Sequence, residues 1–146
     1  MVTRETHRRV VGTFESVLFP EYADGKVIAK IDTGAYTGAL HCERIEERHV
    51  DGGKVLIFEP LDGGVEITKD DFVIKYVKSS NGKREKRYFV TTEIVLQDKN
   101  YVISLSLTDR SDMKWPVLIG RRFLKQHHFI VDPHRSDAYR EQQKAK

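Results

Sequence analysis

Short apolar runs rich in β-branched and aromatic residues alternate along this chain with polar turn residues, a pattern typical of a β-sandwich or β-barrel. The turns include Asp51-Gly-Gly, Asp62-Gly-Gly and Ser80-Asn-Gly, whose residues suit the positive φ angles of tight hairpin turns. The pattern predicts a mostly β chain, with strands over 10–18, 26–31, 39–41, 54–59, 72–78, 87–96, 101–107 and 117–119.

Helical composition is found in one stretch, Arg121-Arg-Phe-Leu-Lys-Gln-His127, which follows a glycine and ends well before Pro133. No linker or low-complexity segment divides the 146 residues, a length at which one domain with one core is expected. We therefore expect a single domain over residues 1–146, with its core at about 11–133 and a polar tail over 134–146.

Charge and hydropathy narrow the range of functions. Lys+Arg minus Asp+Glu is 25 − 22 = +3, which excludes a histone-like or strongly acidic protein and predicts no nucleic-acid partner. The mean hydropathy is −0.51, no apolar run approaches the ~18 residues of a membrane helix, and the first residues lack the apolar stretch of a signal peptide. We expect a cytoplasmic protein without a membrane partner.

Cys42 is the single cysteine, which excludes an intrachain disulfide and a cysteine-based zinc ribbon.

The stretch Val27-Ile-Ala-Lys-Ile-Asp-Thr-Gly-Ala35 places a carboxylate directly after an apolar strand. Gly34 permits another backbone to approach closely, Thr33 offers a hydroxyl for hydrogen bonds, and Ala35 leaves space for a substrate. Such a setting would hold Asp32 rigidly and leave it accessible. An isolated Asp-Thr-Gly also fits an ordinary turn at the end of a strand. The rest of the sequence must therefore distinguish a catalytic loop from such a turn.

A second landmark lies far along the chain, where the apolar strand Val117-Leu-Ile runs into Gly120, Arg121 and the predicted helix. Together with strand-Asp-Thr-Gly-Ala, this arrangement resembles the retropepsin-like aspartic peptidases, and more closely a bacterial branch labelled ATP-dependent zinc proteases. The resemblance covers about Val11 to Pro133 and is carried by six blocks in order: Ala29–Ala35, Ala39–His41, Ser80–Gly82, Leu107–Ser111, Leu118–Leu124 and Val131–Pro133.

The resemblance implies an all-β fold, a closed barrel of the acid-protease type with a hairpin flap and one short C-terminal helix. The catalytic residue would be Asp32. It implies a supporting loop of Thr33, Gly34 and Ala35, a second loop of Leu118, Ile119, Gly120 and Arg121, and a flap over 76–88 with its substrate-binding tip at Ser79, Ser80, Asn81, Gly82 and Lys83.

Two positions depart from the family's pattern. Retroviral members carry a second aspartate just after Asp-Thr-Gly-Ala, where this chain has Tyr36. This difference puts in question the ion pair that such an aspartate would make with an arginine like Arg121. Gly38 stands where many bacterial relatives carry a small hydroxyl residue, and we expect it to loosen the loop.

Aspartic peptidases use two carboxylates, one ionised to activate a water and one protonated to donate to the scissile carbonyl. This chain contains a single Asp-Thr-Gly, so a working site would require a homodimer in which each copy contributes Asp32. The resemblance therefore implies an endopeptidase that hydrolyses peptide or protein substrates without a metal or other cofactor.

Two other functions stay open at this point. The same fold could serve as a non-catalytic module that holds a peptide by strand addition under the hairpin. The family label suggests a metal-dependent protease, for which His41, Cys42, Glu43, Glu46 and His49 could offer ligands. On a strand, however, His41 and Cys42 point to opposite faces, and neither a phosphate-binding Gly-rich loop nor His-Glu-x-x-His occurs, so we expect no metal site.

The segment 78–87 is strongly basic, with five positive charges and one negative charge, or 5 − 1 = +4. Such a run fits a solvated edge hairpin that its charges protect from aggregation. This solvated edge is the ordinary interpretation, and the functional alternative is a flap that prefers acidic peptides.

Overall fold

The computed structural model describes residues 9–78, 81–109 and 114–135, and β-strands account for most of them. The strands are β1 (Arg9–Val11), β2 (Phe14–Leu18), β3 (Val27–Ile31), β4 (Gly38–Val50), β5 (Gly53–Pro60), β6 (Ile67–Lys69), β7 (Val73–Lys78), β8 (Arg84–Leu96), β9 (Lys99–Thr108), β10 (Val117–Ile119) and β11 (Phe129–Val131). One short helix, α1 (Arg121–Gln126), lies between β10 and β11 in the described chain. None of the helical structure in these ranges is long and apolar enough to cross a membrane.

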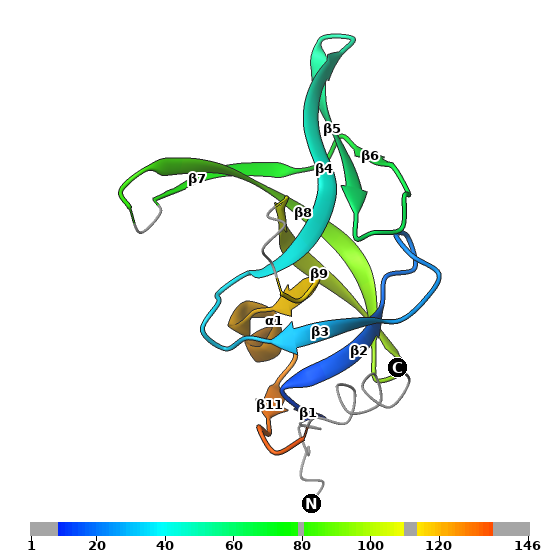
Figure 1. Ribbon diagram of the computed structural model, residues 1–146, viewed down its shortest axis with the longest axis vertical. Coiled ribbons are helices and arrows are strands. Elements are labelled where there is room, and N and C mark those ends of the chain that lie inside the picture. Colours follow the sequence, from blue (N-terminus) through cyan, green and yellow to red (C-terminus); the bar gives the residue numbers. More distant parts are fainter. Residues whose placement is uncertain (1–8, 79–80, 110–113, 136–146) are drawn as a thin grey trace, which may run out of the picture.

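Six strands close into a barrel in the order β10-β3-β2-β8-β9-β4, after which β4 pairs with β10 again (Figure 1). Closure depends on the three-residue strand β10, which runs parallel to β3 and antiparallel to β4. Fully buried side chains from all six strands belong to one apolar core: Val17, Ala29, Leu40, Ile94, Leu105 and Ile119. The predicted all-β closed barrel with one short helix is confirmed.

Two long hairpins, β4–β5 and β7–β8, extend from the barrel in different directions (Figure 1). The first four residues of β4 pair with β9 inside the barrel, whereas residues 44–50 pair with β5 in the projecting hairpin. A bulge between Cys42 and Arg44 marks the change of partner. Bulges bend a strand, which explains how one 13-residue strand serves both parts of the fold.

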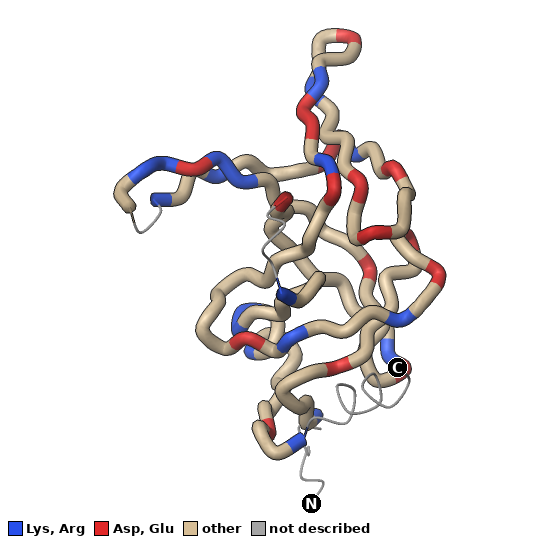
Figure 2. Tube along the Cα trace, in the orientation of Figure 1, with Lys and Arg blue, Asp and Glu red and all other residues tan. Residues whose placement is uncertain are grey.

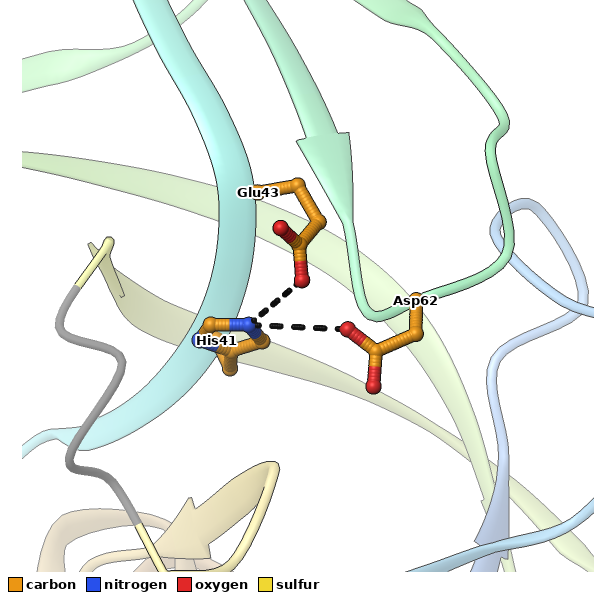
Figure 3. Close-up of side chains that lie close together, drawn as sticks. All are labelled: His41, Glu43 and Asp62. Carbon is orange, nitrogen blue, oxygen red and sulfur yellow. Dashed lines mark hydrogen bonds and ion pairs between the residues drawn. The ribbon is translucent and has the colours of Figure 1, made fainter.

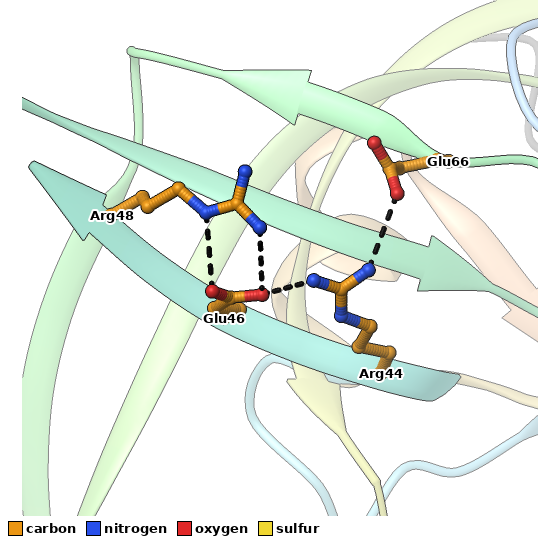
Figure 4. Close-up of polar contacts among 4 residues, drawn as sticks. All are labelled: Arg44, Glu46, Arg48 and Glu66. Carbon is orange, nitrogen blue, oxygen red and sulfur yellow. Dashed lines mark hydrogen bonds and ion pairs between the residues drawn. The ribbon is translucent and has the colours of Figure 1, made fainter. Parts of the chain in front are cut away.

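The projecting part of β4 carries a charged ladder at alternate positions, which share one face of the strand (Figure 4). The Glu46 carboxylate accepts hydrogen bonds from Arg48 and Arg44, and the Arg44 guanidinium also reaches Glu66, at 3.3 Å. These contacts, led by the hydrogen bond from Arg48, lower the pKa of Glu46 below its ordinary value. Because the four side chains are about one-third to one-half exposed, the ladder contributes little to stability and chiefly keeps the hairpin polar.

The structure corrects several predicted strand boundaries. The strand expected over 10–18 is divided into β1 and β2 at Gly12, where a Cβ atom would lie 2.0 Å from the Arg135 carbonyl oxygen. The strand expected over 39–41 extends to Val50. The sequence did not predict this extension, because the second half of β4 is polar and contains no apolar run. The three-residue strands β6 and β11 were not predicted from the sequence.

Gly38 provides a test of barrel closure. A Cβ atom there would lie 2.0 Å from the Leu118 carbonyl oxygen, so Gly38→Ala must push β4 away from β10. We expect the free energy of unfolding to fall by about 1–3 kcal/mol, the usual cost of overpacking. The matched control is Gly25→Ala, where nothing lies within 4 Å of the added carbon. Urea denaturation of the two variants measures the difference, and equal stabilities would contradict the tight crossing.

Candidate active site

Asp32 lies directly after β3, half-buried, on a turn that hydrogen bonds fix from both sides. Its backbone N–H donates to the Ile119 carbonyl at 2.9 Å, and its own carbonyl accepts from the Ala35 N–H at 3.2 Å. The Gly34 N–H donates to Asp32 Oδ1 at 3.0 Å. The carboxylate is therefore oriented by its own turn and still reaches solvent, as the sequence predicted.

The second predicted loop lies directly against this turn. Leu118 and Ile119 belong to β10, which pairs in register with Lys30 and Ile31 of β3. At Gly120 a Cβ atom would lie within 2.9 Å of the Ala35 and Tyr36 carbonyl oxygens, so the residue must be glycine for the two segments to cross. The structure thus brings Asp32 and its three supporting residues together with the four residues of the second loop, although the two segments lie 121 − 35 = 86 positions apart in the sequence.

The first turn of α1 is capped by the aspartate loop. Backbone N–H groups at the start of a helix lack partners within the helix, and no side chain caps α1 in the described residues. Instead, the Arg121 N–H donates to the Ala35 carbonyl at 2.8 Å and the Arg122 N–H donates to the Tyr36 carbonyl at 3.0 Å. The helix and the loop each satisfy the polar groups of the other.

The expected loosening of the loop by Gly38 is wrong. Gly38 is buried, and the missing side chain allows its backbone to pack against the Leu118 carbonyl oxygen and the Leu105 side chain. A larger residue would separate β4 from β10. The glycine therefore tightens the crossing of the two strands behind the loop.

A cleft of about 350 Å³ opens beside the aspartate loop. Ala35 and Leu118 line it on the side of the loop, and Glu85, Lys86, Arg87 and Tyr88 line it on the side of the β7–β8 hairpin. Its remaining lining comes from the start of β4 and the end of β9, including Thr37, Ile45, Ser106 and Asp109. Ala35 thus borders open space, which agrees with the role expected of a small residue there.

The β7–β8 hairpin is the predicted flap, and its strands pair from Val73 with Phe89 to Lys78 with Arg84. At its tip Gly82 has a φ of +84°, and the Lys83 N–H donates to the Asn81 side chain at 3.3 Å. Ser79 and Ser80, also predicted to belong to the tip, lie outside the described residues. Figure 2 shows the basic residues distributed along both strands of this hairpin.

Glu47, which the sequence did not single out, joins the flap to the β4–β5 hairpin. Its carboxylate accepts hydrogen bonds from Lys86 Nζ and the Tyr88 hydroxyl, both at 3.2 Å, and its side chain is only 17% exposed. The hydrogen bond from Lys86 lowers the pKa of Glu47 below its ordinary value. No local sequence motif predicts this contact, because Glu47 and Lys86 lie 39 positions apart in the sequence.

The metal ligands considered from the sequence do not come together as one set. Cys42 is completely buried, and burial raises the pKa of its thiol to about 12, so it stays neutral as the predicted small core residue. Glu46 belongs to the charged ladder. His41 and Glu43 do lie together, with Asp62 as a third neighbour (Figure 3).

In this cluster the His41 Nε2 lies 3.1 Å from Glu43 Oε1 and 3.7 Å from Asp62 Oδ1. One imidazole and two carboxylates are suitable ligands for a divalent transition metal. Glu43 and Asp62 are 56% and 83% exposed, so water competes for both carboxylates. Among the described residues, this cluster is the place where a cation could bind.

A closed barrel in which an Asp-Thr-Gly-Ala turn crosses an apolar-Gly strand defines the retropepsin-like class of proteins. The chain belongs to the RimB-like family, described as the retropepsin-like aspartic endopeptidase RimB, whose model matches residues 10–142. The resemblance predicted from the six sequence blocks is confirmed.

Related proteins add two further findings. The chain is 29% identical over 138 residues to a protein of Desulfotalea psychrophila and 31% identical over 133 residues to one of Shewanella halifaxensis, both named probable alpha-L-glutamate ligase. These matches cover 90% and 87% of this chain but only 30% and 29% of the two relatives, so the chain spans less than a third of their length. A crystal structure of a Legionella pneumophila protein of unknown function superimposes with a TM-score of 0.71 at 29% identity, covering 88% of this chain and 95% of that one.

Proposed function

We propose that this protein is an aspartic endopeptidase that works as a homodimer, with one Asp32 from each copy. The observation that carries the proposal is the position of Asp32, whose carboxylate is half-buried and oriented by the Gly34 N–H, and whose turn borders a cleft beneath the flap. A substrate peptide in that cleft would lie between the aspartate loop and the β7–β8 hairpin.

The chemistry requires a second carboxylate beside the first. Two carboxylates about 3 Å apart cannot both ionise, so they share one proton and titrate as a unit. The ionised member takes a proton from the attacking water, while the protonated member donates to the carbonyl oxygen of the scissile bond. Because the sequence holds a single Asp-Thr-Gly, the second member must come from a second copy across a two-fold axis.

We infer that the substrates are acidic peptides. Lys86 and Arg87 line the cleft, where they pair with Glu47 and Glu85, and carboxylates of a bound peptide could exchange with these partners. The relatives named as glutamate ligases support the same class, since adding glutamate residues to a chain produces an acidic peptide. A peptidase domain of this kind would act on such a product.

A metal-dependent hydrolase is the second candidate, and the His41–Glu43–Asp62 cluster is the observation that favours it. A metal held there would lower the pKa of a bound water and supply a nucleophile. The two candidates differ in their response to chelators and in their need for Asp32.

Replacing Asp32 tests the chemistry. Asp32→Asn keeps the side-chain volume but cannot ionise, so peptide cleavage should fall by at least ~10²–10⁴-fold, the usual contribution of general acid–base catalysis. The matched control is Asp24→Asn, an exposed aspartate in the loop before β3, which should cleave like the wild type. Cleavage of acidic and neutral peptides is measured from about pH 3 to 8, and the wild type should give a bell-shaped profile.

The same assay with a chelator separates the alternatives. The aspartic mechanism predicts full activity with chelator and without added zinc or ATP. Chelator-sensitive cleavage that Asp32→Asn retains and His41→Ala loses would identify the metal site as the active one. Peptide binding without cleavage by the wild type would instead indicate a non-catalytic binding module.

Mixing experiments test the dimer. If each site needs Asp32 from both copies, adding inactive Asp32→Asn chains to the wild type should reduce activity more than in proportion, because mixed dimers are inactive. Specific activity should also fall on dilution as dimers dissociate. Constant activity per chain at concentrations where sedimentation detects monomers alone would contradict the homodimer.

Charge removal tests the acidic preference. In the double variant Lys86→Gln/Arg87→Gln, the ratio of kcat/KM for acidic over neutral peptides should fall and depend less on salt. The matched control, Lys26→Gln/Lys125→Gln, removes the same charge from exposed positions outside the cleft lining. If the first variant keeps the wild-type preference for acidic peptides, the basic segment 78–87 is a solvated hairpin edge and does not select the substrate.

A further inference from the structure

Tyr36 follows the Asp-Thr-Gly-Ala turn and is 56% exposed, an unusual position for a large aromatic ring. The ring contacts Arg121, whose guanidinium carbon lies 5.3 Å from the ring centroid. This distance is within the range of a cation–π contact, in which the ring face attracts the positive charge. The sequence offered no explanation for Tyr36, and the structure supplies this one.

Arg121 in turn contacts the backbone of the aspartate loop. Its Nη1 donates to the Gly34 carbonyl at 3.2 Å and approaches the Thr33 carbonyl at 3.5 Å, while its backbone N–H donates to Ala35. One residue therefore faces three consecutive carbonyl groups of the loop. A lysine would keep the charge, but its ammonium lacks the planar group that stacks on the ring.

Gly34 connects this arrangement to the carboxylate. Its carbonyl accepts the hydrogen bond from Arg121, and its N–H donates to Asp32 Oδ1 at 3.0 Å. The Gly34 N–H shares its peptide group with the Thr33 carbonyl, so Arg121 contacts both the peptide group that holds the carboxylate and the one after it. The ring of Tyr36 limits the movement of a long side chain that would otherwise be mobile at this exposed position.

We propose that Tyr36 and Arg121 are positioning residues, and that the stack of ring on guanidinium holds the Asp32 turn in the geometry that catalysis requires. The catalytic part of this inference rests on the proposed aspartic mechanism, whereas the stack and its effect on the turn do not. Neither residue needs to touch the reacting atoms. Their effect reaches Asp32 through the backbone of Gly34.

Hydrogen exchange of the backbone amides at 33–37 tests the structural part without any substrate. Tyr36→Leu and Arg121→Lys should each raise exchange there by about two- to fivefold, the factor that corresponds to one exposed cation–π contact. Tyr36→Phe keeps the ring and should exchange like the wild type. The matched control is Tyr76→Leu on the flap, where a ring that is 57% exposed also meets an arginine, Arg84, at 5.0 Å. That variant should leave exchange at 33–37 unchanged.

Kinetics test the catalytic part. The Gly34 N–H orients the Asp32 carboxylate, so a loosened turn should slow the chemical step without weakening the binding of the peptide. We expect Tyr36→Leu to lower kcat with little change in KM, and Tyr36→Phe to restore kcat.

Each result decides one part of the inference. Unchanged exchange in Tyr36→Leu overturns the stack as a restraint on the turn. Faster exchange with an unaltered kcat overturns the positioning role and leaves a structural contact. A wild type that cleaves no peptide rejects the proposed function, while the exchange comparison still tests the stack.

Discussion

The hydrogen bonds between the turn after β3 and the segment from β10 to α1 are the contacts on which the rest of the structure depends. Asp32 donates its N–H to Ile119, and the carbonyls of Ala35 and Tyr36 accept the first free N–H groups of α1. The same crossing closes the barrel, because β10 joins β3 to β4. Because no side chain caps the helix, a shift of the loop would leave the first N–H groups of α1 without their protein partners. The geometry of the candidate active site is thus fixed by the contacts that complete the fold.

The flap is restrained differently, through side chains along β8. Glu47 on β4 accepts from Lys86 and Tyr88 of β8, while the tip around Gly82 projects from the barrel. Lys86 and Tyr88 also line the cleft, so the residues that join the flap to the β4–β5 hairpin are themselves part of the cleft wall.

Much of this arrangement was predictable because it depends on local signals. Asp32, Gly120 and Arg121 stand at the ends of short apolar strands, and the order of the blocks along the chain identified the barrel that joins them. The polar half of β4, the contact of Glu47 with Lys86, and the grouping of Asp62 with His41 could not be predicted. Each depends on where a bulge or a hairpin directs the chain, and neither periodicity nor turn composition contains that information. Gly38 was misinterpreted because a glycine that permits close packing and one that permits movement look the same in a sequence.

The charge of the flap illustrates how the fold changes a property read from the sequence. The basic segment 78–87 has a net charge of +4. Glu47 of the β4–β5 hairpin pairs with Lys86, which reduces the local charge to 4 − 1 = +3. Arg87 pairs with Glu85 on its own strand at 3.1 Å. A carboxylate that enters the cleft must therefore exchange with these partners, so it gains less than two unpaired cations would offer.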